Sequence, residues 1–335
     1  LFVGSSIALA DSATSVQNLL RASPGAPQSL EAVRTLQEGG PEAEALRGQL
    51  VQALRTAETP RDLEYISDLL SRSQKNTGYE ILLDRMNGGE LPMRVAAIRA
   101  IRAQLFRKVT ISTETRRTTL DRLSALIGDK KADYQLRTVA LEALSALGSD
   151  GFDAIVKELE KGRLTGLSSI YTAIGATGDP RALTVLRDVV RDPASPDGDV
   201  MQALAAAGEL FREARAAGRR PVPPDQVAAW EDTLRPLFDR DEQVVAEALK
   251  AWGQLHGPSQ DPGFRRSMLA AIKSPSPFLK VAALEQIAQG MLPIDAEILE
   301  EVNRLNADKQ QPDTVRVAAD AVLARHRHAQ EGTLP

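Results

Sequence analysis

Few side chains in this sequence could carry catalysis, and the three histidines are the first to consider. His326 and His328 are two residues apart, so a helix would place them on different faces, where they could not bind one metal ion. His256 precedes Gly257, which is typical of a histidine at the C-terminal end of a helix. None of them belongs to an H-E-x-x-H or His-Glu pattern. We therefore predict no metal site and no catalytic histidine.

Other common catalytic patterns are also absent from the sequence. With no cysteine, the chain has no thiolate nucleophile, disulfide or thiolate metal ligand. It has no G-x-S-x-G turn, no phosphate-binding Walker loop and no dinucleotide glycine fingerprint. We predict that the protein is not an enzyme, has no catalytic residues and binds no cofactor.

The stretch from Asp133 to Gly148 shows which elements would position any site. Asp133 stands where a helix-capping side chain belongs, and Gly148 where a helix stops. Between them, the apolar residues have the spacing i, i+3, i+4, i+7, i+8 and i+11, which gives one broad stripe on a helix. The stripe consists of Leu136, Val139, Ala140, Ala143, Leu144 and Leu147. Thr138, Glu142 and Ser145 lie opposite it, facing solvent or a partner.

The composition favours many such helices over one thick globular core. The 335 residues are 43% hydrophobic, 26% charged and only 4% aromatic, and the apolar residues are mostly Ala and Leu. A repeat array can grow to this length because each unit packs only on its neighbours. The net charge of −4 argues against a protein built mainly to neutralise phosphates. We predict an all-α protein that does not bind nucleic acid.

Degenerate copies of the Asp133–Gly148 pattern recur along the chain. The position of Arg137 is occupied in the other copies by Arg94, Leu164, Val200, Val245, Lys280 and Arg316, with Arg47 a weaker match upstream. The partner helices are expected at 113–127, 150–161, 180–191, 224–238, 261–273 and 295–306. One helical hairpin per copy fits the steps of about 27 to 47 residues. We predict an α-solenoid, a superhelix of about eight stacked antiparallel hairpins.

Proline and glycine set the boundaries of this array. Residues 11–27 are expected to form an N-terminal helix and a linker, and residues 28–328 the repeat array. The prolines at 218–224 forbid helix and predict an insertion there. Residues 329–335 are expected to be a disordered tail. No stretch approaches the roughly 20 apolar residues that span a bilayer.

Residues 1–10 predict a separate role for the N-terminal segment. They carry no charge and end in Ala8-Leu9-Ala10, which is similar to the hydrophobic end and A-x-A cleavage site of a secretory signal. The pattern favours a remnant of a signal peptide or an N-terminal anchor, on a periplasmic or otherwise exported protein. The alternatives are a frayed segment or a helix that covers the first repeat, and a cytoplasmic protein.

Several segments resemble HEAT repeats, and more closely the short HEAT-like repeats first noted in phycobilisome lyases. They are the run at 173–182, AIGATGDPRA, and the copies that start at Pro92–Ala97 and Thr314–Ala319. The resemblance implies an armadillo-like solenoid in which the second helix of each hairpin lines the concave face. It also implies an Asp–Arg ladder between repeats that is interrupted at Val200 and Val245. The ladder residues would be Asp133, Arg137, Asp241 and Arg316.

Some families with HEAT-like repeats are enzymes, and this sequence departs from each of them. Deoxyhypusine hydroxylases hold iron with His-Glu pairs, which the chain lacks. HEAT-like DNA glycosylases use a basic groove with aromatic and acidic residues, whereas Trp252 here aligns with the core position Leu144 and is expected to be buried. A chromophore lyase activity is suggested only by the repeat subtype, and such folds host many activities.

The second helices are expected to present a polar row as the protein-binding surface. Val95 and Ser145 belong to this row. Its candidate binding residues are Arg99, Arg102, Thr138, Glu142, Lys250 and Glu285. The row is positive in an early copy and mixed later, which would suit an extended partner with uneven charge.

The sequence therefore favours a non-catalytic scaffold or adaptor that binds one or more proteins, in a multi-subunit assembly of the cell envelope. The alternative is an intracellular regulatory or maturation factor that clasps an enzyme. A third class, a HEAT-like DNA glycosylase or chromophore lyase, has no recognisable site in this chain.

Overall fold

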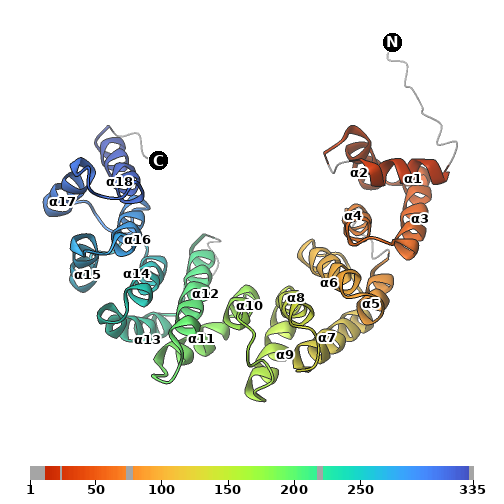
Figure 1. Ribbon diagram of the computed structural model, residues 1–335, viewed down its shortest axis with the longest axis horizontal. Helices are drawn as coiled ribbons and strands as arrows, with labels where there is room; N and C mark the ends of the chain where they lie inside the picture. Colours follow the sequence, from red (N-terminus) through yellow and green to blue (C-terminus); the bar gives the residue numbers. More distant parts are fainter. Residues whose placement is uncertain (1–11, 23–24, 73–77, 217–221, 332–335) are drawn as a thin grey trace, which may run out of the picture. The chain divides into compact units, whose positions relative to one another are not determined.

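The computed structural model describes residues 12–22, 25–72, 78–216 and 222–331. Throughout these ranges the regular elements are helices, and none is a strand. Figure 1 shows helix following helix along the chain, joined by short turns. This confirms the predicted all-α fold. The predicted export segment 1–10, residues 218–221 of the predicted insertion and the last four residues of the predicted tail lie outside the described residues.

The helices form two compact units, which divide inside α10 (Ile170–Ala176), between Ala173 and Ile174. The N-terminal unit holds α1 (Ser12–Arg21), α2 (Pro27–Glu38), α3 (Gly40–Thr56), α4 (Pro60–Ser71), α5 (Tyr79–Asn87), α6 (Leu91–Phe106), α7 (Thr113–Gly128), α8 (Tyr134–Ser145) and α9 (Ser149–Glu160). The C-terminal unit holds α11 (Ala182–Arg191), α12 (Asp197–Ala216), α13 (Pro224–Leu234), the 3₁₀ helix η1 (Arg235–Asp239), α14 (Glu242–His256), α15 (Pro262–Lys273), α16 (Pro277–Ala288), α17 (Ala296–Ala307) and α18 (Asp313–Gln330).

Most of these helices pack in consecutive pairs. In the N-terminal unit α3 packs on α4, α5 on α6 and α7 on α8; in the C-terminal unit α11 packs on α12, α13 with η1 on α14, α15 on α16 and α17 on α18. The second helices also pack on one another, α6 between α4 and α8, and α14 and α16 between α12 and α18 (Figure 1). α9 and α10 hold the place of an eighth pair in the sequence. The predicted hairpin architecture is therefore present.

Capping side chains begin the helices where the sequence predicts. The carboxylate of Asp133 accepts hydrogen bonds from the backbone N–H groups of Gln135, at 2.8 Å, and Leu136, at 3.3 Å. Asp241 caps α14 in the same way, through the N–H of Gln243 at 3.0 Å. These carboxylates satisfy N–H groups that have no partner inside the helix and lie at the positive end of its dipole.

The apolar stripe of α8 is buried, as its spacing predicts. All six stripe residues, from Leu136 to Leu147, are at most 5% exposed. Arg137, Leu141 and Ser145 are buried as well, which the single stripe did not predict. The reason is that a second helix packs on its own partner helix and on neighbouring second helices, so only a narrow strip of its surface reaches solvent.

The copy that contains Leu164 departs from the expected helix. Leu164 is buried in a turn, and α10 starts only at Ile170. Gly162 and Gly166 have positive φ angles of 64° and 87°, which no helix can contain. These two glycines therefore cut the second helix of this copy to seven residues.

Two helix ends also differ from the prediction. α13 stops at Leu234 and continues as a tight 3₁₀ turn, because Pro236 has no N–H and its ring would crowd the preceding turn of an α-helix. At the other end of the unit, α18 continues to Gln330 and includes the first two residues of the predicted tail. The buried Val315, Ala319 and Val322 anchor this last helix on its neighbours.

In α6 and α8, the arginine at the position of Arg137, which we call the repeat arginine position, binds backbone oxygens. Arg137 is buried and donates to the oxygen of Ile127, near the end of α7, at 3.0 Å and to that of Arg163, beyond α9, at 2.7 Å. Arg94 donates to the oxygen of Met86, near the end of α5, at 3.0 Å. The carbonyl groups of a last helical turn lack partners inside the helix, so these guanidinium groups satisfy them and join the two helices of a hairpin. The bond from Arg137 to Arg163 also reaches the segment after α9.

The Asp–Arg ladder implied by the resemblance is therefore wrong for this chain. Asp133 and Asp241 cap their own helices, and Arg316 pairs with Asp313 one turn earlier in α18. The weaker upstream match, Arg47, lies on the first helix of a hairpin, where it pairs with Glu44.

Candidate interaction surface

In the N-terminal unit the predicted polar row lies on α6 and α8. Arg99 is exposed, and Arg102, Thr138 and Glu142 are half-buried. Arg102 donates to the carboxylate of Glu142 across the two helices at 2.6 Å. The hydroxyl of Thr138 donates to the backbone oxygen of Tyr134 at 2.9 Å, so it is satisfied within its own helix. The structure thus brings Arg102 and Glu142 together and leaves Arg99 beside them.

This part of the row is balanced in charge, where the sequence suggested an excess of positive charge. Glu142 on α8 neutralises Arg102. On the other side of α6, the carboxylate of Glu64 on α4 lies 3.9 Å from the guanidinium of Arg99. Acidic side chains from both neighbouring helices therefore flank the basic side chains of α6.

Two predicted members of the row are buried. Val95 and Ser145 are each 3% exposed, and the hydroxyl of Ser145 donates to the backbone oxygen of Glu142 at 2.8 Å. In the copy of α14, the position of Ser145 faces the next second helix. At the same position in α14, a Cβ on Gly253 would lie 2.6 Å from the side-chain oxygen of Gln286, which shows how closely α14 and α16 approach.

In the repeat alignment, leaving aside the copy with the shortened helix α10, the position of Glu142 reaches solvent in every copy. In the C-terminal unit Glu285 is exposed, and Lys250 is half-buried and pairs with Glu247 at 2.9 Å. We call this set of positions the exposed row. It consists of Arg99 and Glu142 in the N-terminal unit, and of Ala205, Lys250, Glu285 and Ala321 in the C-terminal unit.

Exposed apolar side chains lie on the same helices, and the sequence analysis did not single them out. Phe106 at the end of α6 is 55% exposed, with the guanidinium of Arg102 over its ring at 5.3 Å from the centroid. In the C-terminal unit Phe278 on α16 is 49% exposed and Val317 on α18 is 68% exposed. Val317 occupies the position of Thr138 in its copy, so the repeat alignment contained the signal that would have identified it.

His256, at the end of α14, belongs to an aromatic cluster. Its ring lies 4.8 Å from that of Trp252, and its Nε2 lies 3.2 Å from the carboxylate of Glu231. Burial lowers the pKa of His256 and so favours the neutral imidazole, although the nearby carboxylates of Glu231 and Asp261 act in the opposite direction. Trp252 itself is fully buried, as the alignment with Leu144 predicted. Within the described ranges, no three histidine or acidic side chains are placed to hold a metal ion.

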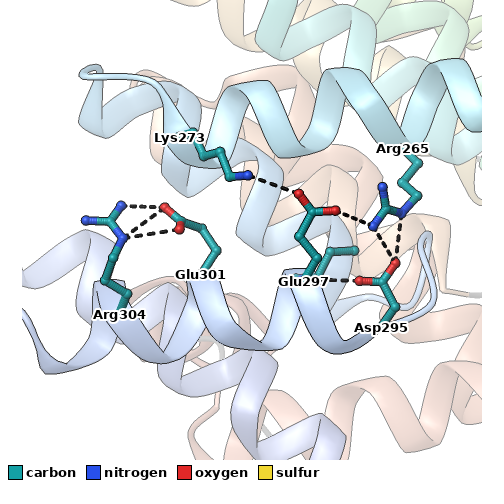
Figure 2. A network of polar contacts seen from close by, with 7 residues as sticks. Arg265, Lys273, Asp295, Glu297, Glu301 and Arg304 are labelled. Carbon is teal, nitrogen blue, oxygen red and sulfur yellow. Dashed lines mark hydrogen bonds and ion pairs between the residues drawn. The ribbon is translucent and has the colours of Figure 1, made fainter.

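The first helices α15 and α17 carry a network of ion pairs, shown in Figure 2. Arg265 on α15 contacts Asp295 and Glu297, each at 2.7 Å, and Lys273 contacts Glu297 at 3.1 Å. Asp295 also caps α17 through the N–H of Ile298 at 3.0 Å. The hydrogen bonds from Arg265 lower the pKa of both Asp295 and Glu297. The network joins two hairpins on the layer opposite to the exposed row.

We expect the Arg265→Met variant to unfold at a lower temperature than the wild type at pH 7, by about 1–3 °C. Because the pKa of Asp295 and Glu297 is lowered in the folded state, this stabilisation is complete above their unfolded pKa of about 4. It is lost as the pH falls through the folded-state pKa, so the difference in Tm should shrink below about pH 4. Thermal melts by circular dichroism between pH 3 and 7 measure it.

The matched control is Arg327→Met, which removes an exposed arginine that makes no ion pair among the described residues. Its Tm should follow that of the wild type at every pH. A difference for Arg265→Met that stayed undiminished at pH 3 would contradict the assignment.

None of the described helices is both long enough and apolar enough to cross a membrane.

Comparison with known proteins shows the fold. The structure is similar to importin beta, with a TM-score of 0.54 and 14% identity over 92% of this chain and 49% of that chain. It is also similar to Kap95p in a structure with RanGDP, with a TM-score of 0.54 and 10% identity over 89% of this chain and 44% of that chain. Kap121p bound to the SUMO protease Ulp1p matches with a TM-score of 0.46 and 13% identity over 94% and 37% of the two chains.

These matches confirm a HEAT-like α-solenoid. The chain spans between 37% and 49% of the length of the three solved chains. No protein-family model and no curated protein matches the sequence.

Proposed function

We propose that this protein is a non-catalytic scaffold that binds partner proteins through the exposed row and the exposed apolar side chains of its second helices. The observation that carries the proposal is that the second helices of both units present charged side chains of the exposed row, and large apolar side chains outside that row, which the packing of the hairpins does not bury. In the N-terminal unit they are Arg99, Glu142 and Phe106. In the C-terminal unit they are Glu285, Phe278 and Val317.

The mixture of side chains suits a protein partner. Binding energy at protein interfaces is concentrated in a few aromatic and arginine side chains, and charges around them give specificity and orientation. Arg102 and Phe106 already form such a pair. The guanidinium of Arg102 is held by Glu142, so the side chain loses little freedom when a partner covers it.

The fold supports the same class of function. Kap95p, whose fold is similar, binds the protein RanGDP. Catalysis would need nucleophilic, acid–base or metal-binding groups that converge on one point. The charged side chains around the exposed row instead form separate ion pairs between neighbouring helices, Arg99 with Glu64 and Arg102 with Glu142.

We also propose that the protein is exported and acts within an assembly of the cell envelope. The proposal rests on the uncharged segment 1–10 and its Ala8-Leu9-Ala10 end, which is similar to a signal cleavage site. Sequencing the mature N-terminus from native cells tests it. A chain that begins at Asp11 supports export, and a chain that retains residues 1–10 in the cytoplasm supports the alternative, a regulatory factor that clasps an enzyme.

Binding should be weakened by substituting a charged side chain of the exposed row together with an exposed aromatic side chain of the second helices, in either unit. The partner is first captured from native cells and purified, and its Kd for the wild type is measured by calorimetry. We expect Arg99→Glu with Phe106→Ala, and separately Phe278→Ala with Glu285→Lys, to raise Kd at least about tenfold. All four side chains are exposed, so the fold should be retained.

The control variant is Arg117→Glu on α7, a first helix, where the side chain is 84% exposed and does not belong to the row. It should leave Kd unchanged. If both double variants bound the captured partner as tightly as the wild type, the exposed row would not be the binding surface.

A further inference from the structure

An open groove of about 620 Å³ lies in the C-terminal unit, where η1 and the start of α14 meet α15 and the start of α16. It is separate from the exposed row, and it shares no residue with it. Its lining residues are Arg235, Phe238, Arg240, Glu242, Val245, Gly263, Arg266, Ser267, Ala270, Ala271, Ser274 and Leu279.

The groove exists because Val245 occupies the repeat arginine position. In the copy of α8, Arg137 fills the equivalent space and reaches the end of the preceding first helix and the turn of the next hairpin. Val245 is too short to do so. Phe238 and Ser274, which stand at the corresponding two places, are therefore left as walls of an open groove.

The groove is positively charged on a chain whose net charge is −4. Arg235, Arg240 and Arg266 line it, against the single carboxylate of Glu242. Arg266 is exposed and makes no ion pair within the described part of the chain. The other two arginines each have one carboxylate partner, and most of their N–H donors remain available.

The base of the groove is apolar. Val245 and Ala271 are buried there, and Phe238 and Leu279 are half-buried beside them. These residues could cover one apolar side chain of a bound segment. Acidic side chains on either side of it in that segment would then contact the arginines. Phe238 is the one aromatic lining residue, so the groove offers no series of rings on which nucleotide bases could stack.

We propose that this groove is a second binding site, for an extended acidic protein segment that carries one apolar side chain. The apolar side chain lies against Phe238, Val245 and Leu279, and the flanking carboxylates bind Arg266 and Arg240. Charged guanidinium groups bind carboxylates with two parallel hydrogen bonds, which an ammonium or an amide cannot imitate. The site adds a specific anchor for an acidic segment to the broader surface of the exposed row.

The probe for this site is a fluorescein-labelled peptide with three glutamates on each side of a leucine, titrated with the full chain at low salt and followed by fluorescence anisotropy. We expect saturable binding that weakens as salt rises. Arg266→Glu should raise Kd at least about tenfold. Ala270→Tyr, at an exposed lining position, should also raise Kd by obstructing the groove without changing its charge.

Three controls define the result. Arg327→Glu changes the net charge as much as Arg266→Glu but lies on α18, and it should bind the peptide like the wild type. Arg99→Glu with Phe106→Ala should also leave peptide binding unchanged, which separates this site from the exposed row. A peptide with lysine in place of glutamate should not bind.

Three outcomes would overturn the proposal. They are the absence of saturable binding up to about 1 mM peptide, an unchanged Kd for both Arg266→Glu and Ala270→Tyr, and tighter binding of single-stranded oligothymidylate that Arg266→Glu abolishes. The last outcome would assign the groove to nucleic acid.

Discussion

Substituting alanine for Trp252 should lower the free energy of unfolding of the C-terminal unit by about 3–5 kcal/mol. Trp252 is fully buried, and its ring lies 5.7 Å from that of Phe238 and 5.9 Å from that of Phe264. The guanidinium of Arg235 covers it at 5.0 Å from the ring centroid. Truncation removes all of these contacts and leaves a cavity between three elements of the unit, which the rigid helices cannot close.

The cost comes from packing, because the indole N–H of Trp252 has no hydrogen-bond partner among the described residues. Trp252→Phe should therefore retain much of the stability that Trp252→Ala loses. Urea denaturation followed by far-ultraviolet circular dichroism measures both variants. Phe106→Ala, which truncates an aromatic ring that is 55% exposed, is the control and should change the free energy by less than about 0.5 kcal/mol. Equal stability of Trp252→Ala and wild type would contradict the buried cluster.

The burial of Trp252 also shows why so much of the fold could be predicted. Its position follows from alignment with Leu144, and helical periodicity depends only on the local spacing of apolar residues. Caps such as Asp133 and Asp241 are local for the same reason, since a capping side chain binds N–H groups two or three residues away. Features that depend on neighbours in sequence were therefore predictable.

The surface was less predictable because its charge and exposure depend on other hairpins. Nothing near Arg99 in the sequence indicates that Glu64 of α4 lies beside it. Ser145 looks like a surface residue on one helix, and it is only 3% exposed in the packed array. Of the polar positions opposite an apolar stripe, the position of Glu142 is therefore predicted correctly as a surface position. The position of Ser145 is predicted wrongly.

The groove follows from a change in the repeat pattern that is visible in the sequence, but the groove itself is visible only in the structure. The sequence shows that Val245 replaces the repeat arginine, and from this we expected only an interrupted ladder. Whether the missing side chain leaves a filled or an open space depends on Phe238 of η1 and on Arg266 and Ser274, which belong to α15 and its C-terminal cap. The repeat arginine position, which joins helices in α6 and α8, lies at the base of a groove in α14. In repeat proteins, copies that lose a structural residue are therefore good places to look for binding sites.

Gly151 provides the sharpest test of how the hairpins are joined. It lies in the first turn of α9, where a Cβ would stand only 1.9 Å from the backbone oxygen of Leu144 and 3.4 Å from the Cβ of Leu147. The backbone at the end of α8 cannot move aside as a flexible side chain could. Gly151→Ala should therefore displace α9 from α8 and lower the free energy of unfolding by about 1–3 kcal/mol or more, as overpacking does in a close-packed interior.

The matched control is Gly48→Ala in α3, because Gly48 is exposed and a Cβ there would meet no atom within 4 Å. Alanine restricts the unfolded chain and favours helix, so this variant should be more stable by about 0.5–1 kcal/mol. The same substitution should thus have opposite signs at the two glycines. Urea denaturation compares the stabilities, and hydrogen exchange shows whether the loss at Gly151 is centred on α8 and α9. If Gly151→Ala were as stable as Gly48→Ala, the close approach of α9 to Leu144 would be refuted.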